Sequence, residues 1–247
     1  MKLTVYNQVP NILYYYLIAY PRIKIRIFEN MDNQDIENKK ISINIFLFPS
    51  LLLIIISSVK IIELKYGIHF SHFGLYPKDI EGLKGIILSP FIHGSIKHLF
   101  NNIIPLFFLL SAMIHFYGKM AYFIYILIQI ISGIILWFIG REVFHIGASG
   151  IVYGLASFMF FSGIFRRNTQ LLAFSLLITF LYGSMVWGVF PETVKKGVSW
   201  EAHLSGTIVG TILSIIFLKK GPQRKKYEWD EDSNEDSNED YIYHIVE

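Results

Sequence analysis

The stretch HIGASGIVYG, residues 145–154, stands at the start of a long apolar run. Small residues surround Ser149 in this stretch, with Gly147 before it and Gly150 and Gly154 after it. Such residues allow two membrane helices to approach closely, so helix packing is one interpretation of the serine. A nucleophile placed where lipid meets water is the other. The polar residues elsewhere in the chain distinguish the two.

The composition is that of a membrane protein. Of the 247 residues, 53% are hydrophobic and only 17% are charged, whereas about a quarter of the residues in soluble domains are charged. Apolar windows of about 20 residues, enough to cross a hydrocarbon core of roughly 30 Å, recur along the chain. We therefore predict an all-α, polytopic membrane protein built as a bundle of six transmembrane helices, at residues 41–62, 90–114, 120–139, 146–165, 171–190 and 202–218.

Charge and residue content argue against several classes of function. The net charge of +3 is too small to indicate nucleic-acid binding, and the absence of cysteine excludes disulfides and thiolate catalysis. No metal site is predicted, because His69, His72 and His115 lack ligand spacing and acidic partners. No cofactor is predicted either. The middles of the predicted spans contain no Asp or Glu, whereas a proton-coupled transporter would use buried carboxylates as relays.

Basic residues indicate the orientation of the spans, because lysine and arginine favour the cytoplasmic ends. The denser set is Lys39, Lys40, Lys119, Arg166, Arg167, Lys219, Lys220, Arg224, Lys225 and Lys226. The opposite side carries Lys65, Lys78, Lys84, Arg141, Lys195 and Lys196, spread over longer loops. Both termini of this multi-pass protein are therefore predicted to lie in the cytoplasm, with the spans in the cell membrane.

Two segments flank the predicted core of residues 41–218. Residues 1–40 are predicted to be a cytoplasmic or interfacial segment. Two interpretations stay open for them: an interfacial anchor, or a start that belongs at Met31. Residues 219–247 begin basic and become acidic, with EDSN twice in succession. Such a composition cannot bury enough apolar surface to fold alone, so a disordered cytoplasmic tail is predicted.

The polar residues of the spans gather at one depth. His98 and Asn102 lie near the start of the second predicted span, Ser149 near the start of the fourth, and His203 near the start of the sixth. Because consecutive spans alternate in direction, the starts of the even-numbered spans share one side, which is predicted to be the outer one. Polar groups are costly inside a membrane, so their convergence on one layer indicates a shared function.

The chemistry of that layer suits acyl transfer. A serine hydroxyl becomes a nucleophile when a neutral histidine accepts its proton, so Ser149 and His203 form a candidate dyad. His98 and Asn102 are one helical turn apart and, with the backbone N–H of Ser149, could donate to an oxyanion. Tyr153, one turn after Ser149, could pack flat against the imidazole. Close helix approach would come from the glycines, which are Gly147, Gly150 and Gly154 on one helix and Gly206 and Gly210 on the other.

These segments resemble the signature motifs of the rhomboid intramembrane serine proteases. The motifs are HGSIKHLFNN, GASG with Tyr153, and AHLSGTIVG, and the resemblance covers roughly residues 45–218. It implies Ser149 as nucleophile with Gly147 beside it, His203 as base, and His98 and Asn102 at the oxyanion. It also implies a structural role for His93. The implied substrates are transmembrane segments of other membrane proteins with helix-destabilising residues near the outer leaflet.

The chain departs from the family in its first loop, and two alternatives to a protease stay open. GLKGIILSPFIH lacks the Trp-Arg pair that many rhomboids carry before His93, so we expect the first loop, which bears on substrate entry and lipid contacts, to be shaped or anchored differently. A catalytically silent rhomboid-like protein that binds transmembrane helices is one alternative, and a membrane transporter or scaffold is the other. His145 is predicted to be a solvated loop residue, and Glu201 to project away from His203.

Overall fold

The computed structural model describes residues 43–181, 187–192 and 197–223. The predicted segment 1–40 and most of the predicted tail lie outside the described residues. Within these ranges the chain forms helices and no β-strand, apart from one isolated antiparallel bridge between Leu75 and His145. The longer helices are α2 (Asn44–Tyr66), α4 (Ile96–Tyr117), α5 (Met120–Ile139), α6 (Ser149–Phe165), α7 (Thr169–Leu181) and α8 (Trp200–Ile216).

Three of the described helices, α2, α4 and α5, are long and apolar enough to cross a membrane. Helices α6 and α8 have 17 residues each and α7 has 13 described residues. At 1.5 Å per residue, a 17-residue helix is roughly 25 Å long. The described part of the chain is therefore an all-helical membrane protein, with three helices of full spanning length, two shorter apolar helices, α6 and α7, and the 17-residue helix α8.

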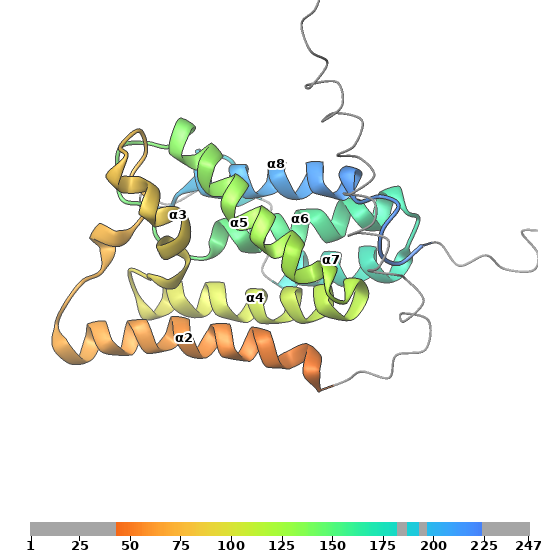
Figure 1. The fold of residues 1–247 in the computed structure, drawn as a ribbon, viewed down its shortest axis with the longest axis horizontal. Coiled ribbons are helices and arrows are strands. Elements are labelled where there is room, and N and C mark those ends of the chain that lie inside the picture. Colours follow the sequence, from red (N-terminus) through yellow and green to blue (C-terminus); the bar gives the residue numbers. More distant parts are fainter. Residues whose placement is uncertain (1–42, 182–186, 193–196, 224–247) are drawn as a thin grey trace, which may run out of the picture. The chain divides into compact units, whose positions relative to one another are not determined.

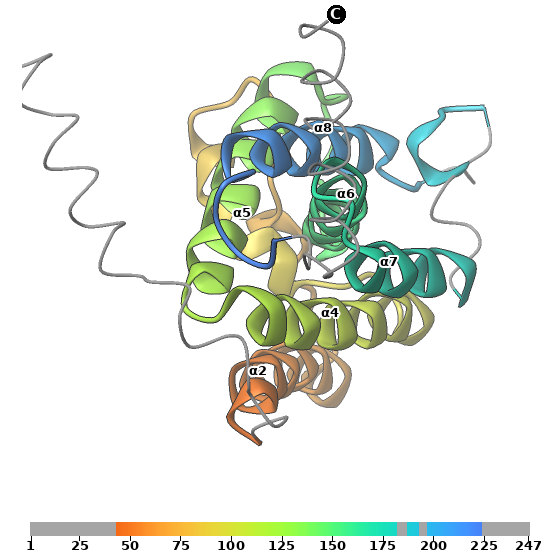
Figure 2. The same ribbon diagram turned by 90° about the vertical axis from the view of Figure 1, so that its right-hand side faces the viewer.

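Helix α6 lies at the centre of this arrangement. Figure 2 shows it surrounded by α4, α5, α7 and α8, whereas α2 lies on the far side of α4. The position follows from the sequence of α6, which is apolar on every face, as expected of a helix with neighbours all around. Its buried side chains include Leu155, Phe158 and Met159, none of which is exposed. Helices α6 and α8 lie side by side (Figures 1 and 2), so the N-termini of both can contribute to one site.

Helix α2 extends further than the sequence predicted. It continues to Tyr66, and Gly67 ends it with φ +64°, a left-handed conformation that suits glycine. Lys60 and Glu63 therefore lie inside the helix, where both are buried and form an ion pair at 2.9 Å. The other carboxylate oxygen of Glu63 accepts the backbone N–H of Phe70 and so ties the following loop to the helix.

Helices α4 and α6 begin later than predicted, and each has a local cause. The span predicted from residue 90 begins with the 3-10 turn Ser89–Phe91, and α4 starts only after Ser95, whose hydroxyl caps it by accepting the N–H of His98. The span predicted from residue 146 starts at Ser149, because Gly147 adopts φ +105° and cannot belong to a helix.

The predicted span at residues 171–190 is not one continuous helix. Residues 182–186 lie outside the described residues, and Trp187–Val189 form the 3-10 helix η5. Helix α8 begins at Trp200, two residues before its predicted start, because the Ser199 hydroxyl caps it by accepting the N–H of Ala202 at 3.3 Å. Only the span at 120–139 coincides with its helix, α5.

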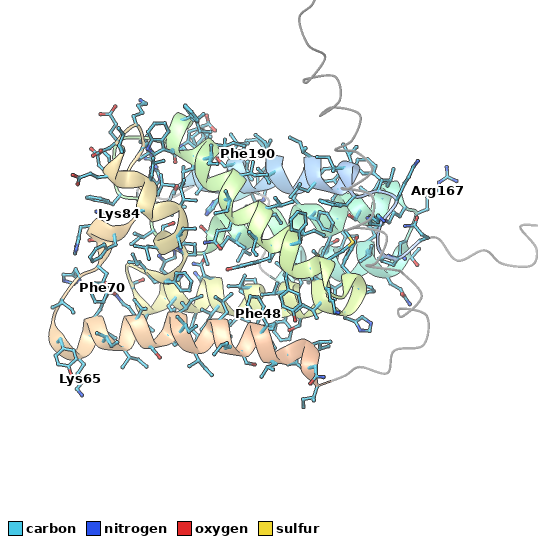
Figure 3. The ribbon with its side chains drawn as sticks, in the orientation of Figure 1. Phe48, Lys65, Phe70, Lys84, Arg167 and Phe190 are labelled. Atoms are coloured by element: carbon cyan, nitrogen blue, oxygen red, sulfur yellow. The ribbon has the colours of Figure 1, made fainter. Side chains whose placement is uncertain are left out.

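Charged side chains mark the two ends of the helices. Figure 3 shows Lys65 and Lys84 at one end and Arg167 at the other. The flanks between them expose apolar side chains, among them Leu47 and Phe180, which are 71% and 83% exposed. Such flanks suit lipid rather than water. The N-termini of α4, α6 and α8 all lie toward the end that carries Lys65 and Lys84 (Figure 1).

Candidate active site

The turn before α6 presents Ser149 at the first position of the helix. Gly147 donates its N–H to the Ser89 carbonyl oxygen at 2.8 Å and has a positive φ that other residues rarely adopt. A Cβ atom on Gly147 would lie 2.7 Å from His98 Nε2, so the glycine also makes room for that imidazole. The first N–H groups of a helix have no acceptor within it, so those of Ser149 and Gly150, which have no acceptor among the described residues, are available to an anion.

Ser149 lies within hydrogen-bonding distance of His203. The Ser149 Oγ–His203 Nε2 distance is 2.9 Å, and His203 Nδ1 lies 2.7 Å from the Gly188 carbonyl oxygen. A carbonyl oxygen can only accept, so the proton of the neutral ring belongs on Nδ1. Nε2 then carries the lone pair toward the serine hydroxyl. This is the arrangement that a general base requires.

Tyr153 lies flat against the His203 ring, as the spacing from Ser149 predicts. The ring centroids are 4.1 Å apart and the planes are inclined by 7°. Gly188 completes the enclosure, because a Cβ atom there would overlap the Tyr153 hydroxyl and lie 3.2 Å from His203 Nδ1. The imidazole is thus held by a ring on one face and by a backbone carbonyl at its edge. Neither partner carries a charge.

Four glycines bring the backbones of α6 and α8 into contact. A Cβ atom on Gly206 would overlap the Gly150 carbonyl oxygen, and one on Gly210 would overlap that of Gly154. Below this contact, Ser157 Oγ bonds to the Thr207 carbonyl oxygen at 2.9 Å and to Thr211 Oγ1 at 2.8 Å. The separation of the two helices near Ser149 is therefore fixed by main-chain atoms.

His93, in the connection before α4, and His98 and Asn102, in the first turns of α4, lie near the same turn. The His98 ring lies beside Gly147 and makes an edge contact with His93, with centroids 5.0 Å apart. Asn102 is 3% exposed, and its amide nitrogen donates to the His98 carbonyl oxygen at 2.7 Å. Its Oδ1 and both ring nitrogens of His93 are buried without a partner among the described residues. His98 thus lies beside the serine turn, whereas the Asn102 amide bonds to its own helix.

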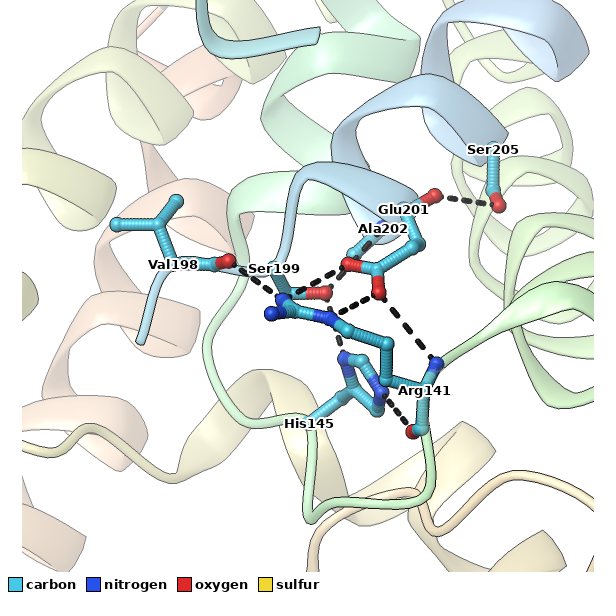
Figure 4. A network of polar contacts seen from close by, with 7 residues as sticks. All are labelled: Arg141, His145, Val198, Ser199, Glu201, Ala202 and Ser205. Carbon is cyan, nitrogen blue, oxygen red and sulfur yellow. Dashed lines mark hydrogen bonds and ion pairs between the residues drawn. The ribbon is translucent and has the colours of Figure 1, made fainter. Parts of the chain in front are cut away.

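The prediction that His145 is a solvated loop residue is wrong. His145 is 3% exposed, and its Nδ1 lies 2.6 Å from Ser199 Oγ while its Nε2 lies 2.9 Å from the Arg141 carbonyl oxygen (Figure 4). Its backbone pairs with Leu75, which brings the first loop against this connection. Burial lowers the pKa of the His145 imidazole, an effect that the carbonyl contact with Arg141 and the nearby carboxylate of Glu201 only partly offset.

Lowering the pH from 7 to 5 is expected to reduce the thermal stability of the protein in detergent, in part through His145. Its folded-state pKa lies below the ordinary histidine value, so the unfolded chain binds the proton first. The neutral His145 therefore contributes fully to the free energy of unfolding at pH values above the ordinary histidine pKa. This contribution is lost as the pH falls from the ordinary pKa toward the lower folded-state pKa. The unfolding midpoint of His145→Gln should depend less on pH over this range. A dependence equal to that of the wild type would contradict this prediction.

Glu201 projects away from His203, as predicted, but it has a partner that the sequence did not suggest. The Arg141 guanidinium contacts both carboxylate oxygens, through Nε to Oε1 and through Nη2 to Oε2, the latter at 3.2 Å. Nη2 also donates to the Val198 carbonyl oxygen at 2.9 Å. The Glu201 side chain is 1% exposed and that of Arg141 is 51% exposed. Spacing along the sequence could not pair them, because 60 residues separate them.

The structure gives no group of three His, Asp or Glu side chains that could hold a metal ion, within the described residues. The polar atoms around Ser149 are those of hydroxyl, imidazole, amide and backbone groups. Their arrangement therefore suits proton transfer to and from a serine and hydrogen bonding to a developing anion.

Comparison with known proteins agrees with the signature segments. The family model for the rhomboid domain matches residues 81–220. A Mycobacterium tuberculosis (strain ATCC 25618 / H37Rv) protein, named as uncharacterised, is 32% identical over 179 residues, covering 68% of this chain and 72% of that protein. A protein of Acanthamoeba polyphaga mimivirus, whose name proposes a rhomboid protein, is 27% identical over 161 residues, covering 62% of this chain and 86% of its own. A Bacillus subtilis (strain 168) protein, whose name proposes a rhomboid protease, is 28% identical over 139 residues, covering 54% of this chain and 66% of that protein.

Proposed function

The chain belongs to the rhomboid family, and on that premise we propose that it is an intramembrane serine endopeptidase with Ser149 as nucleophile and His203 as general base. The observation that carries the proposal is the 2.9 Å approach of Ser149 Oγ to His203 Nε2, on a ring whose Nδ1 is directed at the Gly188 carbonyl oxygen. An interhelical packing contact would not require the ring to have this tautomer.

The reaction proceeds in two halves at this pair. Ser149 Oγ attacks the scissile carbonyl carbon while His203 Nε2 takes the hydroxyl proton, and the tetrahedral intermediate collapses as the imidazolium returns that proton to the leaving amine. A water molecule then attacks the acyl-enzyme, with His203 again acting as base. No carboxylate contacts His203 in the described structure, so Tyr153 and the Gly188 carbonyl oxygen orient the ring.

The oxyanion is stabilised by donors at the start of α6 and from α4. The Ser149 N–H lies at a helix N-terminus, where the backbone favours negative charge. His98 lies beside the preceding turn. The Asn102 amide nitrogen carries two protons, of which one bonds to the His98 carbonyl oxygen, and the other is the donor that we assign to the oxyanion.

Asn102→Ala is expected to lower turnover by roughly 10- to 1000-fold, because one donor to the oxyanion is removed. Labelling of Ser149 by a small serine-directed reagent should persist better than turnover, since the nucleophile and base are unchanged. Both rates are measured on purified protein in detergent. The matched control is Asn101→Ala, which alters an exposed neighbour on the same helix. Turnover equal to the wild type would assign Asn102 to packing instead.

The substrates that we propose are transmembrane segments of other membrane proteins, cut near the outer leaflet. In this proposal six helices cross the membrane within residues 41–218, both termini are cytoplasmic, and the N-termini of α4, α6 and α8 face outward. The family, the apolar flanks and the opposite placement of Lys65 and Arg167 support it (Figure 3). A helical scissile bond hides its carbonyl, so segments that unwind easily are preferred.

Labelling with a fluorophosphonate or isocoumarin reagent tests the proposal. The wild-type protein should be labelled at Ser149, located by mass spectrometry, and should cleave a transmembrane reporter in proteoliposomes. A rhomboid-like protein that only binds transmembrane helices would bind the reporter without either reaction. An unlabelled Ser149 in folded wild-type protein would overturn the proposed function.

A further inference from the structure

We infer that the ion pair between Arg141 and Glu201, together with His145 and Ser199, is a positioning cluster that sets the approach of His203 to Ser149. The inference rests on the proposed function and adds four residues to it, none of which touches the reacting atoms. The cluster lies where the connection from α5 to α6 meets the start of α8 (Figure 4).

The four side chains form one continuous set of contacts. Arg141 binds both carboxylate oxygens of Glu201, and its backbone N–H lies 3.4 Å from Glu201 Oε1. The carbonyl oxygen of the same Arg141 accepts from His145 Nε2. His145 Nδ1 then accepts the Ser199 hydroxyl proton, and Ser199 Oγ caps α8 by accepting the Ala202 N–H. With its proton on Nε2, the neutral His145 imidazole donates to the Arg141 carbonyl oxygen and accepts from Ser199, so each of these polar groups has a partner of the right kind.

Each side of the cluster leads directly into one member of the dyad. On one side His145 lies four residues before Ser149, with the Gly147 turn between them. On the other side Ser199 lies four residues before His203 and Glu201 two residues before it, within the first turn of α8. A shift between the connection and the α8 terminus is therefore a shift between the nucleophile and its base.

The ion pair is suited to holding this junction. The Glu201 carboxylate is buried and lies in the first turn of a helix, where negative charge is favourable, but it still requires a partner for its charge. Arg141 supplies two parallel donors, and this geometry fixes direction as well as distance. The guanidinium also donates to the Val198 carbonyl oxygen, so it binds both the residue before the Ser199 cap and Glu201 in the first turn of α8.

The test compares Arg141→Gln, Glu201→Gln and the double variant in the full-length protein. We expect each single change to lower the rate constant for fluorophosphonate labelling of Ser149, and kcat for a transmembrane reporter, by roughly 10- to 100-fold, the size expected for a misplacement of up to about 1 Å. KM should stay within about 2-fold. The double variant should be faster than Arg141→Gln, because it leaves no unpaired carboxylate buried. Rates are expressed per folded protein, measured by thermal unfolding.

The control is the neighbouring ion pair of Lys78 with Glu142, at 3.4 Å with both side chains largely exposed. Lys78→Gln and Glu142→Gln should leave both rates unchanged. A lower unfolding temperature with an unchanged labelling rate, for Glu201→Gln or Arg141→Gln, would overturn the inference, since it would assign the pair to stability alone. If Arg141→Gln does not fold, Glu201→Gln decides. Wild-type protein that is not labelled at all would contradict the proposed function instead.

Discussion

Ser149→Ala and His203→Ala are each expected to abolish cleavage of a transmembrane reporter, a loss of at least about 10⁴-fold. Without the hydroxyl no acyl-enzyme can form, and without the imidazole no other described side chain lies within hydrogen-bonding distance of Ser149 Oγ to take its proton. Because the two side chains act on one proton, the double variant should be no slower than either single variant. Cleavage is measured in proteoliposomes by the appearance of both product fragments.

Matched controls are available for both substitutions. Ser58 and His69 are exposed and lie on α2 and in the first loop. Ser58→Ala and His69→Ala should therefore cleave at the wild-type rate. The unfolding temperature of Ser149→Ala should stay close to that of the wild type, since it removes one hydrogen bond. His203→Ala also removes the bond to the Gly188 carbonyl oxygen and the stacking on Tyr153, so its cleavage rate is expressed per folded molecule. Full cleavage by Ser149→Ala would exclude the protease function.

Gly210→Val is expected to lower the cleavage rate by roughly 100-fold or more, although it removes no catalytic atom. The first carbon of the new side chain would overlap the Gly154 carbonyl oxygen. That atom belongs to a helix backbone and cannot turn aside, so α8 must move away from α6. A displacement near 1 Å at the dyad costs about 100-fold in rate. Gly210→Ala should lie between the valine variant and the wild type.

The measurement requires folded protein, because overpacking of this kind costs about 1–3 kcal/mol of stability. Unfolding in detergent is followed for each variant, and cleavage is expressed per folded molecule. Ile212→Val is the control on the same helix, since the Ile212 side chain is 49% exposed. If Gly210→Val cleaves as fast as the wild type, the glycine contact does not set the distance between Ser149 and His203.

The helices could be predicted from apolar runs, but most of their first and last residues could not. Helix α5 begins and ends as predicted because short polar connections bound its apolar run on both sides. The other ends depend on single residues that apolar content does not reveal, such as the caps Ser95 and Ser199 and the left-handed Gly67. Local hydrogen bonding and backbone conformation decided these positions, and hydropathy did not.

The proximity of Ser149 to His203 could be predicted because polar side chains are costly in spans and these shared one depth. The Gly188 carbonyl oxygen could not be predicted as a partner of His203, since every residue has a backbone carbonyl and only the folded chain brings this one near. His145 and Arg141 looked like ordinary loop residues for the same reason. Their partners, Ser199 and Glu201, are more than 50 residues away in the sequence.

The contact between α6 and α8 is made of main chain, and this has a consequence for how the protein can diverge. A distance set by packed side chains drifts whenever one of them is replaced, because rotamers and volumes change together. A distance set by backbone against backbone at Gly150, Gly154, Gly206 and Gly210 is the same whatever surrounds it. Lipid-facing positions such as Ile208, Ile212 and Ile215 can therefore exchange among apolar residues while the site keeps its dimensions. The outer surface of the protein can therefore change in sequence while the distance between α6 and α8 at its centre stays the same.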